Sequence, residues 1–332
     1  MRILWLIPNK PENISGGRAR IARHLSDRGI DVDQRQTRLG TALRVLVTAH
    51  RYDCIVGTTR AGAIVGLVAS LVHDVPFVVD HVDPISQFEK TATRLLATPV
   101  RLLENAAFSV ADHVLYVYPE EESRIQQRTG QLTETELGLE FEDFSSVSPR
   151  AVSDVRTSLE EKAGKGQNIA IYVGGLEPLY NVESMLDGIE LLDNWTLVVL
   201  GTGSLSPLVE TASQTREDVV YLGTVPYEDV PAYLHAADVG LSLVDDQHTL
   251  KILEYGAAGL PIVQHTGVAE DRFGELVEYS LPEPNPLSES IRSAVERQNT
   301  RELQSFVERF DWGTIADDYE QAIVSAMKET SV

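Results

Sequence analysis

The sequence predicts an α/β fold with two doubly wound parallel sheets, from the chain length, the apolar strands and the helical spacing between them. The chain has 332 residues, more than one ordinary hydrophobic core holds, so two domains are expected. Residues 2–7 form a short continuous apolar run, typical of a strand buried on both faces of a parallel sheet. Such runs alternate with segments of helical spacing, which favours right-handed βαβ units.

In the first half, a loop rich in turn residues at Pro8–Gly17 precedes a helix expected at Arg18–Arg28. Further strands are expected at 54–56, 76–79 and 114–117, and further helices at 61–72, 87–107 and 120–129. The alternation lapses between Glu140 and Gln167. We therefore place the first domain at residues 1–150.

The second domain is expected at residues 151–312 and repeats the same alternation. Strands are expected at 169–173, 196–200, 219–222, 239–243 and 262–264, and helices at 181–192, 205–215, 227–236, 250–258 and 286–298. The tail, residues 313–332, has apolar side chains four residues apart, which predicts an amphipathic helix with a surface to pack on. The predicted architecture is two Rossmann-like domains that face one cleft.

The net charge of −22 is carried almost entirely by the second half. Residues 1–150 hold 17 Lys and Arg against 19 Asp and Glu, whereas residues 151–332 hold 11 against 31. Strong acidity with only 6 lysines resembles the composition of halophilic proteins. The first 110 residues are the exception, with 14 basic and 10 acidic side chains. This excess indicates either solvated helix faces or a surface that approaches an anionic acceptor or membrane headgroups.

Composition excludes several classes of protein. No run of about 18 apolar residues and no signal peptide are present, so a cytoplasmic protein is expected, with a peripheral place on the inner face of the membrane as an extension. The single cysteine, Cys54, lies in an apolar strand pattern and is expected to be a buried, inert thiol. Neither a nucleic-acid motif nor a clustered metal-ligand pattern is visible, so nucleic acid, metal and other cofactors are not expected.

Two glycine turns lie at matching places in the two halves. Gly16 and Gly17 precede the first helix, and Gly201 and Gly203 follow the strand at 196–200. Glycines at such places let backbone amides face an anionic ligand at a helix N-terminus. Neither turn has the full G-x-G-x-x-G pattern, and an ordinary surface turn is the alternative for each.

The most informative segment is residues 246–263, D-Q-H-T-L-K-I-L-E-Y-G-A-A-G-L-P-I-V. Thr249 is a good N-cap, so a helix is expected to begin at Leu250, beside the cleft. Lys251 lies in its first turn, where a cation is unfavourable unless an anion is bound. Glu254 lies on the same helix face within a core-like stretch, where its carboxylate needs partners such as two ribose hydroxyls. A local ion pair on a solvated face is the alternative.

This segment resembles the retaining glycosyltransferases of family 4, which have the GT-B fold. In that family an acidic residue is followed, after seven intervening residues, by the stretch E-x-(M/G)-A-A-G-x-P-(V/I)-V. Here Asp246 is the first acidic residue and residues 254–263 match the stretch. Other stretches similar to the family follow in order along nearly the whole chain: 16–17 with 25–29, 75–80, 104–112, 173–174, 199–203, 221–225 and 236–240. With its acidity, the chain resembles family members of halophilic archaea.

The resemblance implies a hexosyltransferase that moves a sugar from a nucleotide-sugar donor to an acceptor hydroxyl with retention. It implies that Glu254 binds the donor ribose and that Asp246 is a catalytic residue in contact with the donor sugar. The amides at Thr249 and Leu250 would receive the donor diphosphate. The tail helix would cross back onto the first domain.

Two departures from the family bear on activity. The first acidic residue is usually Glu, and Asp246 is one methylene shorter. The family usually places an Arg and a Lys on the loop after the first strand of the second domain, whereas Gly175 and Tyr180 stand at those positions here. The loss of two cations weakens the stabilisation of a departing diphosphate. Lys251 is the candidate to compensate; otherwise the enzyme is slow, uses another donor or is inactive.

In the first domain, His81 ends a strand at the cleft edge and is a candidate catalytic residue that hydrogen-bonds a sugar hydroxyl or the phosphate; a structural hydrogen bond is the alternative. The helix expected at 87–107 carries Lys90, Arg94 and Arg101 among apolar residues, which suggests a membrane or lipid-acceptor surface or ordinary packing. The expected acceptor is a lipid-linked saccharide or an envelope glycan precursor. A nucleotide-sugar epimerase and a catalytically inactive regulatory subunit with the same fold stay open.

Overall fold

The computed structural model describes the chain except for residues 9–13, 86–87, 89–93, 165–166, 298 and 330–332. Lys90, the first part of the helix expected at 87–107 and the end of the tail fall outside the described residues. The chain divides into two compact units, Met1–Gly138 with Trp312–Val332 and Leu139–Asp311. No helix among the described residues is long and apolar enough to cross a membrane.

The first unit is built on six parallel strands in the order β2-β1-β3-β4-β5-β6. They are β1 (Arg2–Ile7), β2 (Asp31–Gln36), β3 (Cys54–Thr58), β4 (Phe77–His81), β5 (His113–Tyr116) and β6 (Leu132–Glu134). The central strands β3 and β4 are buried at every position, because helices cover both faces of the sheet. Cys54 is buried in β3, and burial raises the pKa of its thiol well above the ordinary value.

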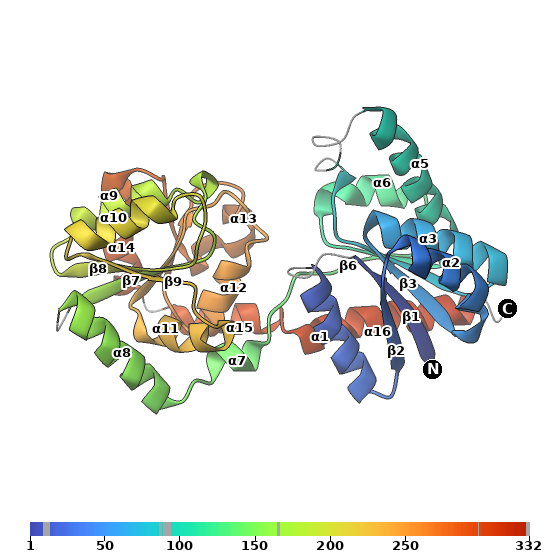
Figure 1. Ribbon diagram of the computed structural model, residues 1–332, viewed down its shortest axis with the longest axis horizontal. Helices are drawn as coiled ribbons and strands as arrows, with labels where there is room; N and C mark the ends of the chain where they lie inside the picture. Colours follow the sequence, from blue (N-terminus) through green and yellow to red (C-terminus); the bar gives the residue numbers. More distant parts are fainter. Residues whose placement is uncertain (9–13, 86–87, 89–93, 165–166, 298, 330–332) are drawn as a thin grey trace. The chain divides into compact units, whose positions relative to one another are not determined.

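Helices cover each face of this sheet with a separate core (Figure 1). On one face lie α1 (Ile14–Asp27) and the tail helix α16 (Trp312–Glu329), which share a core that includes Trp5, Leu25 and Tyr319. On the other face lie α2 (Leu39–Thr48), α3 (Thr59–His73) and α5 (Arg94–Val110), and the short α6 (Glu122–Gln126) follows β5. The tail helix therefore completes the unit in which the chain begins.

The second unit has six parallel strands in the order β12-β11-β10-β7-β8-β9. They are β7 (Asn168–Val173), β8 (Trp195–Leu200), β9 (Val219–Gly223), β10 (Val239–Ser242), β11 (Ile262–His265) and β12 (Glu278–Ser280). This is the strand order of the dinucleotide-binding fold, in which the chain reverses direction across the sheet between its first and fourth strands. Here that switch point lies between β7 and β10.

The helices of the second unit again form two layers. One layer holds α9 (Val182–Glu190), α10 (Ser206–Thr215) and α14 (Pro284–Glu296). The other holds α7 (Phe141–Ser145), α8 (Pro149–Ala163), α11 (Val230–Ala236), α12 (Leu250–Ala257) and α15 (Thr300–Glu308), with α13 (Glu270–Phe273) after β11. Because Leu139 and Phe144 lie in this core, the second unit begins before residue 150, where the sequence placed the boundary.

Candidate functional site

In the second unit, the predicted site residues gather at the carboxyl ends of β7, β8 and β10. Ligands of doubly wound sheets bind at this edge, next to the switch in strand order. The loop after β7 ends in a 3-10 turn, Pro178–Tyr180, and Asn181 Nδ2 then donates to Leu243 O at 2.7 Å. This bond ties the loop to the end of β10, where the acidic segment of the chain begins.

Gly201 and Gly203 lie where the loops after β8 and β7 touch. Gly201 has φ +135°, and a β-carbon added there would lie 1.8 Å from Gly174 O. A β-carbon at Gly203 would lie 2.5 Å from Leu176 O, and Leu176 N donates to Thr202 O at 3.0 Å. Both glycines are therefore required where the backbones of the two loops pack together. This packing shapes the surface at the carboxyl ends of β7 and β8.

Helix α12 begins at Leu250 with Thr249 as its N-cap, at the predicted position. Thr249 is buried, but its hydroxyl makes no capping hydrogen bond. The first amides of α12 therefore lack the side-chain cap that Thr249 was expected to give, and an anion placed there would satisfy them and interact favourably with the helix dipole.

Lys251 reaches from the first turn of α12 across the loop after β7. Its Nζ lies 4.3 Å from the ring centroid of Tyr180 and 5.6 Å from that of Tyr172. A β-carbon at Gly174 would lie 2.6 Å from Lys251 Cε, so only glycine leaves room for the lysine to pass. Lys251 thus brings a cation to the loop that carries Gly175 and Tyr180.

The ammonium of Lys251 is held in an unfavourable environment. Burial lowers the pKa of Lys251, while the charges of Glu254 and Asp246 act in the opposite direction. Among the residues that the structure describes, no carboxylate oxygen lies within 4.0 Å of Lys251 Nζ, so no ion pair forms there. Aromatic faces stabilise the cation only in part. An anionic ligand at this point would supply the missing countercharge.

Glu254 lies one turn beyond Lys251 and is half-buried. Its Oε1 accepts a hydrogen bond of 2.8 Å from the hydroxyl of Tyr227, whose ring packs edge-on against Phe144. The carboxylate is therefore oriented by a neighbour and is partly accessible. The local ion pair with Lys251 that the sequence left open is not formed.

Asp246 lies in the exposed loop between β10 and α12. Its Oδ1 accepts a hydrogen bond of 2.8 Å from the amide of His248, which closes a local turn. The neighbouring Asp245 accepts from the amide of Val268 at 2.9 Å, which fixes the loop after β11 against this segment. No group of three or more His, Cys, Asp or Glu in the described chain is placed to hold a metal ion.

In the first unit, Gly16 and Gly17 lie inside the first turn of α1, which begins at Ile14 rather than at residue 18. The expectation of a glycine loop before the helix is wrong at these positions. A β-carbon at Gly17 would lie 2.7 Å from the ring of Trp312, so Gly17 lets the tail helix approach α1, whereas Gly16 has open space around it. The sequence missed this reason because Trp312 is distant along the chain.

His81 ends β4 and is buried, 1% exposed, between two carboxylates. Its Nε2 lies 3.1 Å from Glu121 Oε2, and its Nδ1 lies 3.6 Å from Glu104 Oε1. These are structural contacts of the kind that the sequence left as the alternative to contact with a sugar.

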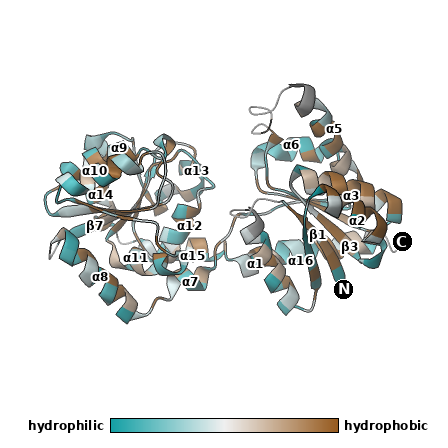
Figure 2. Cartoon of the chain, viewed as in Figure 1, coloured by the Kyte–Doolittle hydropathy of each residue, from teal (hydrophilic) through white to brown (hydrophobic). Residues whose placement is uncertain are grey.

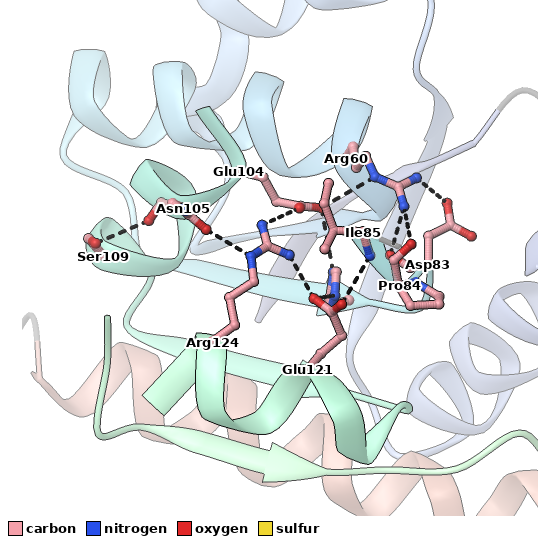
Figure 3. Close-up of polar contacts among 10 residues, drawn as sticks. Arg60, Asp83, Pro84, Ile85, Glu104, Asn105, Ser109, Glu121 and Arg124 are labelled. Carbon is pink, nitrogen blue, oxygen red and sulfur yellow. Dashed lines mark hydrogen bonds and ion pairs between the residues drawn. The ribbon is translucent and has the colours of Figure 1, made fainter. Parts of the chain in front are cut away.

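The surroundings of His81 form a cluster of charges from four elements (Figure 3). Arg124 donates to both Glu104 and Glu121, and Glu121 also accepts the amide of Ile85 at 3.0 Å. Burial raises the pKa of Glu121, but the hydrogen bonds and charges of His81 and Arg124 outweigh it and lower the value to about 2. From α3, Arg60 Nη2 donates to the carbonyls of residues 83 and 84. The cluster therefore fixes residues 83–85, which follow β4.

A second buried network, which sequence reasoning missed, joins α1, β4 and the tail helix. Arg18 donates two hydrogen bonds of 2.8 Å to the carboxylate of Asp80. Tyr319 accepts from Arg18 at 2.8 Å and donates to Asp80 at 2.7 Å, and Thr58 donates to Asp80 at 2.7 Å. No local pattern in the sequence predicts the contact between Arg18 and Tyr319, which are 301 positions apart.

Residues 167–296 match the family model described as Glycosyl transferases group 1. The match runs from β7 to the end of α14 and includes Lys251 and Glu254. The family match indicates a glycosyltransferase. No curated protein matches the chain.

Solved structures with the same fold cover nearly all of the chain. HepE of Anabaena in complex with UDP is 21% identical, with 98% of this chain and 100% of that chain covered and a TM-score of 0.75. The sucrose-phosphate synthase of Thermosynechococcus elongatus is 17% identical, with coverages of 97% and 98% and a TM-score of 0.72. The lipopolysaccharide outer core galactosyltransferase WaaB is 13% identical, with coverages of 98% and 99% and a TM-score of 0.64. The likeness establishes the GT-B glycosyltransferase fold for both units.

Proposed function

We propose that the chain transfers a hexosyl group from a nucleotide-sugar donor to an acceptor hydroxyl with retention, and that the second unit binds the donor at the N-terminus of α12. Two observations at the start of α12 carry the proposal. The ammonium of Lys251 is desolvated beside Tyr180. The hydroxyl of the N-cap, Thr249, makes no hydrogen bond to the first amides of the helix. The donor diphosphate would satisfy both groups, and this stabilisation would grow as the diphosphate departs.

The other donor contacts follow from the same placement. Glu254, held by Tyr227, would accept hydrogen bonds from the ribose hydroxyls, and Asp246 would orient the sugar. Gly16, Gly17 and His81 stay candidates from the first unit; for His81 a role toward substrate would require that the loop after β4 move. We propose that the reaction needs no metal ion or other cofactor, so chelation with EDTA should leave activity unchanged.

The acceptor proposed is a lipid-linked saccharide or envelope glycan precursor, met at the cytoplasmic face of the membrane. The basic excess in the first 110 residues supports this class of acceptor. The composition supports a halophilic source, so assays belong in molar KCl. Because HepE was solved with UDP-glucose, the uridine donors are the first to test.

A binding panel tests the donor site. Calorimetric titration with UDP-glucose and other nucleotide sugars should show binding to the wild type. Glu254→Ala should weaken it by about 10- to 100-fold, the loss of charged hydrogen bonds to the ribose. Glu210→Ala, on an exposed face of α10, is the matched control and should bind normally. If no donor binds the wild type, or if Glu254→Ala binds as well as the wild type, the site is wrongly assigned.

A catalytically inactive subunit is the second candidate, favoured by Gly175 and Tyr180 in place of two cations. Product analysis separates the possibilities. Transfer with retention gives a glycoside of the same anomeric configuration as the donor, which NMR detects. Formation of an epimeric nucleotide sugar without acceptor would indicate an epimerase. Donor binding with neither product would indicate the regulatory subunit.

A further inference from the structure

Helix α2 in the first unit exposes most of its apolar side chains. Leu39, Leu43 and Val47 recur at intervals of four residues and are 81%, 61% and 68% exposed. The helix buries only Val45 of its ten residues. A surface helix normally turns its apolar stripe toward the core. The apolar stripe of α2 faces outward instead.

Helix α3 packs against α2 and continues this apolar surface. Val68, Leu71 and Val72 are 41%, 66% and 60% exposed, at the spacing of one helix face. Figure 2 shows both helices in the colour of hydrophobic residues, with few hydrophilic positions between them. We call these six side chains of α2 and α3 the α2–α3 face. Exposed apolar patches spread over two elements mark surfaces that meet a partner.

Exposed arginines outnumber exposed carboxylates around the α2–α3 face, where Asp53 and, at the end of α3, Asp74 are the acidic residues. Asp53 is the only acidic residue between positions 38 and 73, in a chain with 50 acidic residues. The exposed basic side chains in the same stretch are Arg38, Arg44 and Arg51. The face is therefore apolar, bordered by arginine, and nearly free of carboxylates on a protein of net charge −22.

We propose that the α2–α3 face docks on an anionic lipid membrane. The leucine and valine side chains would enter the headgroup region, and the arginines would pair with lipid phosphates. The carboxylates elsewhere on the chain would be repelled, which favours an approach to the bilayer through this face. Two copies joined through this face would bring their arginines together, which disfavours self-association. The inference rests on the proposed function, because docking would bring the enzyme to a lipid-linked acceptor.

The proposal moves the membrane surface away from the helix where the sequence suggested it. The basic positions expected at 87–107 lie partly outside the described residues, whereas α2 and α3 are described throughout. No helix was expected from the sequence at residues 39–48, so the apolar stripe of α2 was not predicted. Exposure of that stripe is visible only in the structure.

Vesicle sedimentation tests the α2–α3 face with the full chain and without nucleotide sugar. The vesicles contain equal parts phosphatidylglycerol and phosphatidylcholine, or phosphatidylcholine alone, in the lowest KCl concentration at which circular dichroism shows folded protein. Leu43→Ser with Val47→Ser should lower binding to the anionic vesicles at least tenfold. Arg44→Gln with Arg51→Gln should lower it by about fivefold for each arginine removed. The controls in the second unit are Leu191→Ser, at a site 46% exposed, and Arg150→Gln, and both should bind as the wild type does.

Three results would overturn the proposal. The wild type could fail to bind anionic vesicles, or the α2 variants could bind them as well as the wild type does. The wild type could also form a dimer that Leu43→Ser with Val47→Ser dissociates, without vesicle binding, which would make the face an interface between copies. Donor titration of the same variants separates this outcome from the donor site, because the α2 substitutions should leave nucleotide-sugar affinity unchanged.

Discussion

Lys251 shows how one side chain joins the electrostatics of a site to its pH dependence. Burial beside Tyr172 and Tyr180 lowers the pKa of its ammonium, so the apo protein loses this proton at a lower pH than an ordinary lysine does. A bound diphosphate would favour the charged form and raise the pKa again. Donor binding at alkaline pH is therefore coupled to proton uptake at Lys251.

The first prediction concerns this coupling. Donor affinity of the wild type should fall as pH rises from 7 toward 10, whereas Lys251→Arg, whose guanidinium stays charged, should lose less affinity over the same range. Lys251→Gln should bind at least tenfold more weakly at pH 7 and show no such pH dependence. Isothermal titration in buffers of different ionisation enthalpy measures both the affinity and the proton uptake. A wild type with the same affinity at pH 7 and pH 10 would contradict the role of Lys251.

Asp80 carries the second prediction at this scale. Burial raises the pKa of Asp80, but Arg18 and the hydroxyls of Thr58 and Tyr319 outweigh it, so the folded pKa is lowered. A depressed pKa adds stability above the unfolded-state pKa, and this stability is lost as pH falls through the folded value. Asp80→Asn leaves Arg18 buried without its countercharge and should lower the free energy of unfolding by about 3–5 kcal/mol at pH 7.

Urea unfolding at pH 7 and at pH 3 measures the Asp80 prediction. The difference between wild type and Asp80→Asn should shrink at pH 3, which lies below the ordinary pKa of an aspartate, so the lowered folded pKa no longer contributes its full stability. Asp74→Asn is the control, because Asp74 is exposed at the end of α3 with φ 53°, which asparagine tolerates. An Asp80→Asn variant as stable as the wild type at pH 7 would show that the network contributes little.

At the scale of elements, the sequence predicts the apolar strands well and the polar or very short edge strands poorly. β1, β7 and β8 are continuous apolar runs, because helices cover both faces of the sheet there, and their positions could be predicted to within a residue. β2 (D-V-D-Q-R-Q) is an edge strand of largely polar residues, and β6 and β12 have three residues each, so no hydrophobic period marks them. α12 could be predicted from its N-cap and apolar spacing, since both signals are local.

The environment of the site residues could not be predicted in the same way. The aromatic surroundings of Lys251 depend on how the loop after β7 folds over Gly174, and the contacts of His81 depend on Glu104 of α5 and on Glu121 at the start of α6. Contacts of this kind join residues far apart in the chain, and neither periodicity nor capping encodes them. The candidate site residues were visible in the sequence, but their partners were not.

The glycine pair in α1 gives the third prediction. Gly17→Ala would place a methyl group 2.7 Å from the ring of Trp312 and should destabilise the protein by about 1–3 kcal/mol, because the tail helix must shift. Gly16→Ala meets no atom within 4 Å and should be neutral or stabilising by up to about 1 kcal/mol, since alanine favours the helix. Thermal unfolding of the two variants measures the difference. A Gly16→Ala variant that is stable but binds donor or acceptor more weakly would instead favour the ligand role.

The glycine turn after β8 gives the fourth prediction, with Gly223, which also has a positive φ, as the control. Gly201 and Gly223 both have positive φ, +135° and +65°, so alanine strains either position by about 1–3 kcal/mol. Only at Gly201 would the new methyl group also collide with Gly174 O, whereas Gly223 has open space. Gly201→Ala should therefore displace the loop under Lys251 and weaken donor binding, and Gly223→Ala should leave donor affinity unchanged. Equal donor affinity in both variants would contradict the packing of the two loops as a determinant of the site.

At the scale of the whole molecule, the two units differ more in net charge than in fold. Both units have the same doubly wound architecture, but residues 151–332 hold 31 acidic against 11 basic side chains, and residues 1–150 are nearly balanced. The acidic half repels itself in the folded state, and this repulsion is screened as ionic strength rises. A donor diphosphate bound at α12, as proposed, would lie in the more negative half, where the cation of Lys251 would contribute more to its binding.

The last prediction concerns the salt dependence of stability. Raising KCl from 0.1 M to 1 M shortens the screening length from about 10 Å to about 3 Å, so the second unit should gain more stability than the first. Trp195 lies in the second unit and Trp5 and Trp312 lie in the first, so fluorescence of Trp195→Phe reports the first unit and its difference from the wild type reports the second. A gain of about 2 kcal/mol in the second unit would raise its Tm by about 4–8 °C. If the first unit gains as much as the second, the acidity of the second half is not what salt relieves.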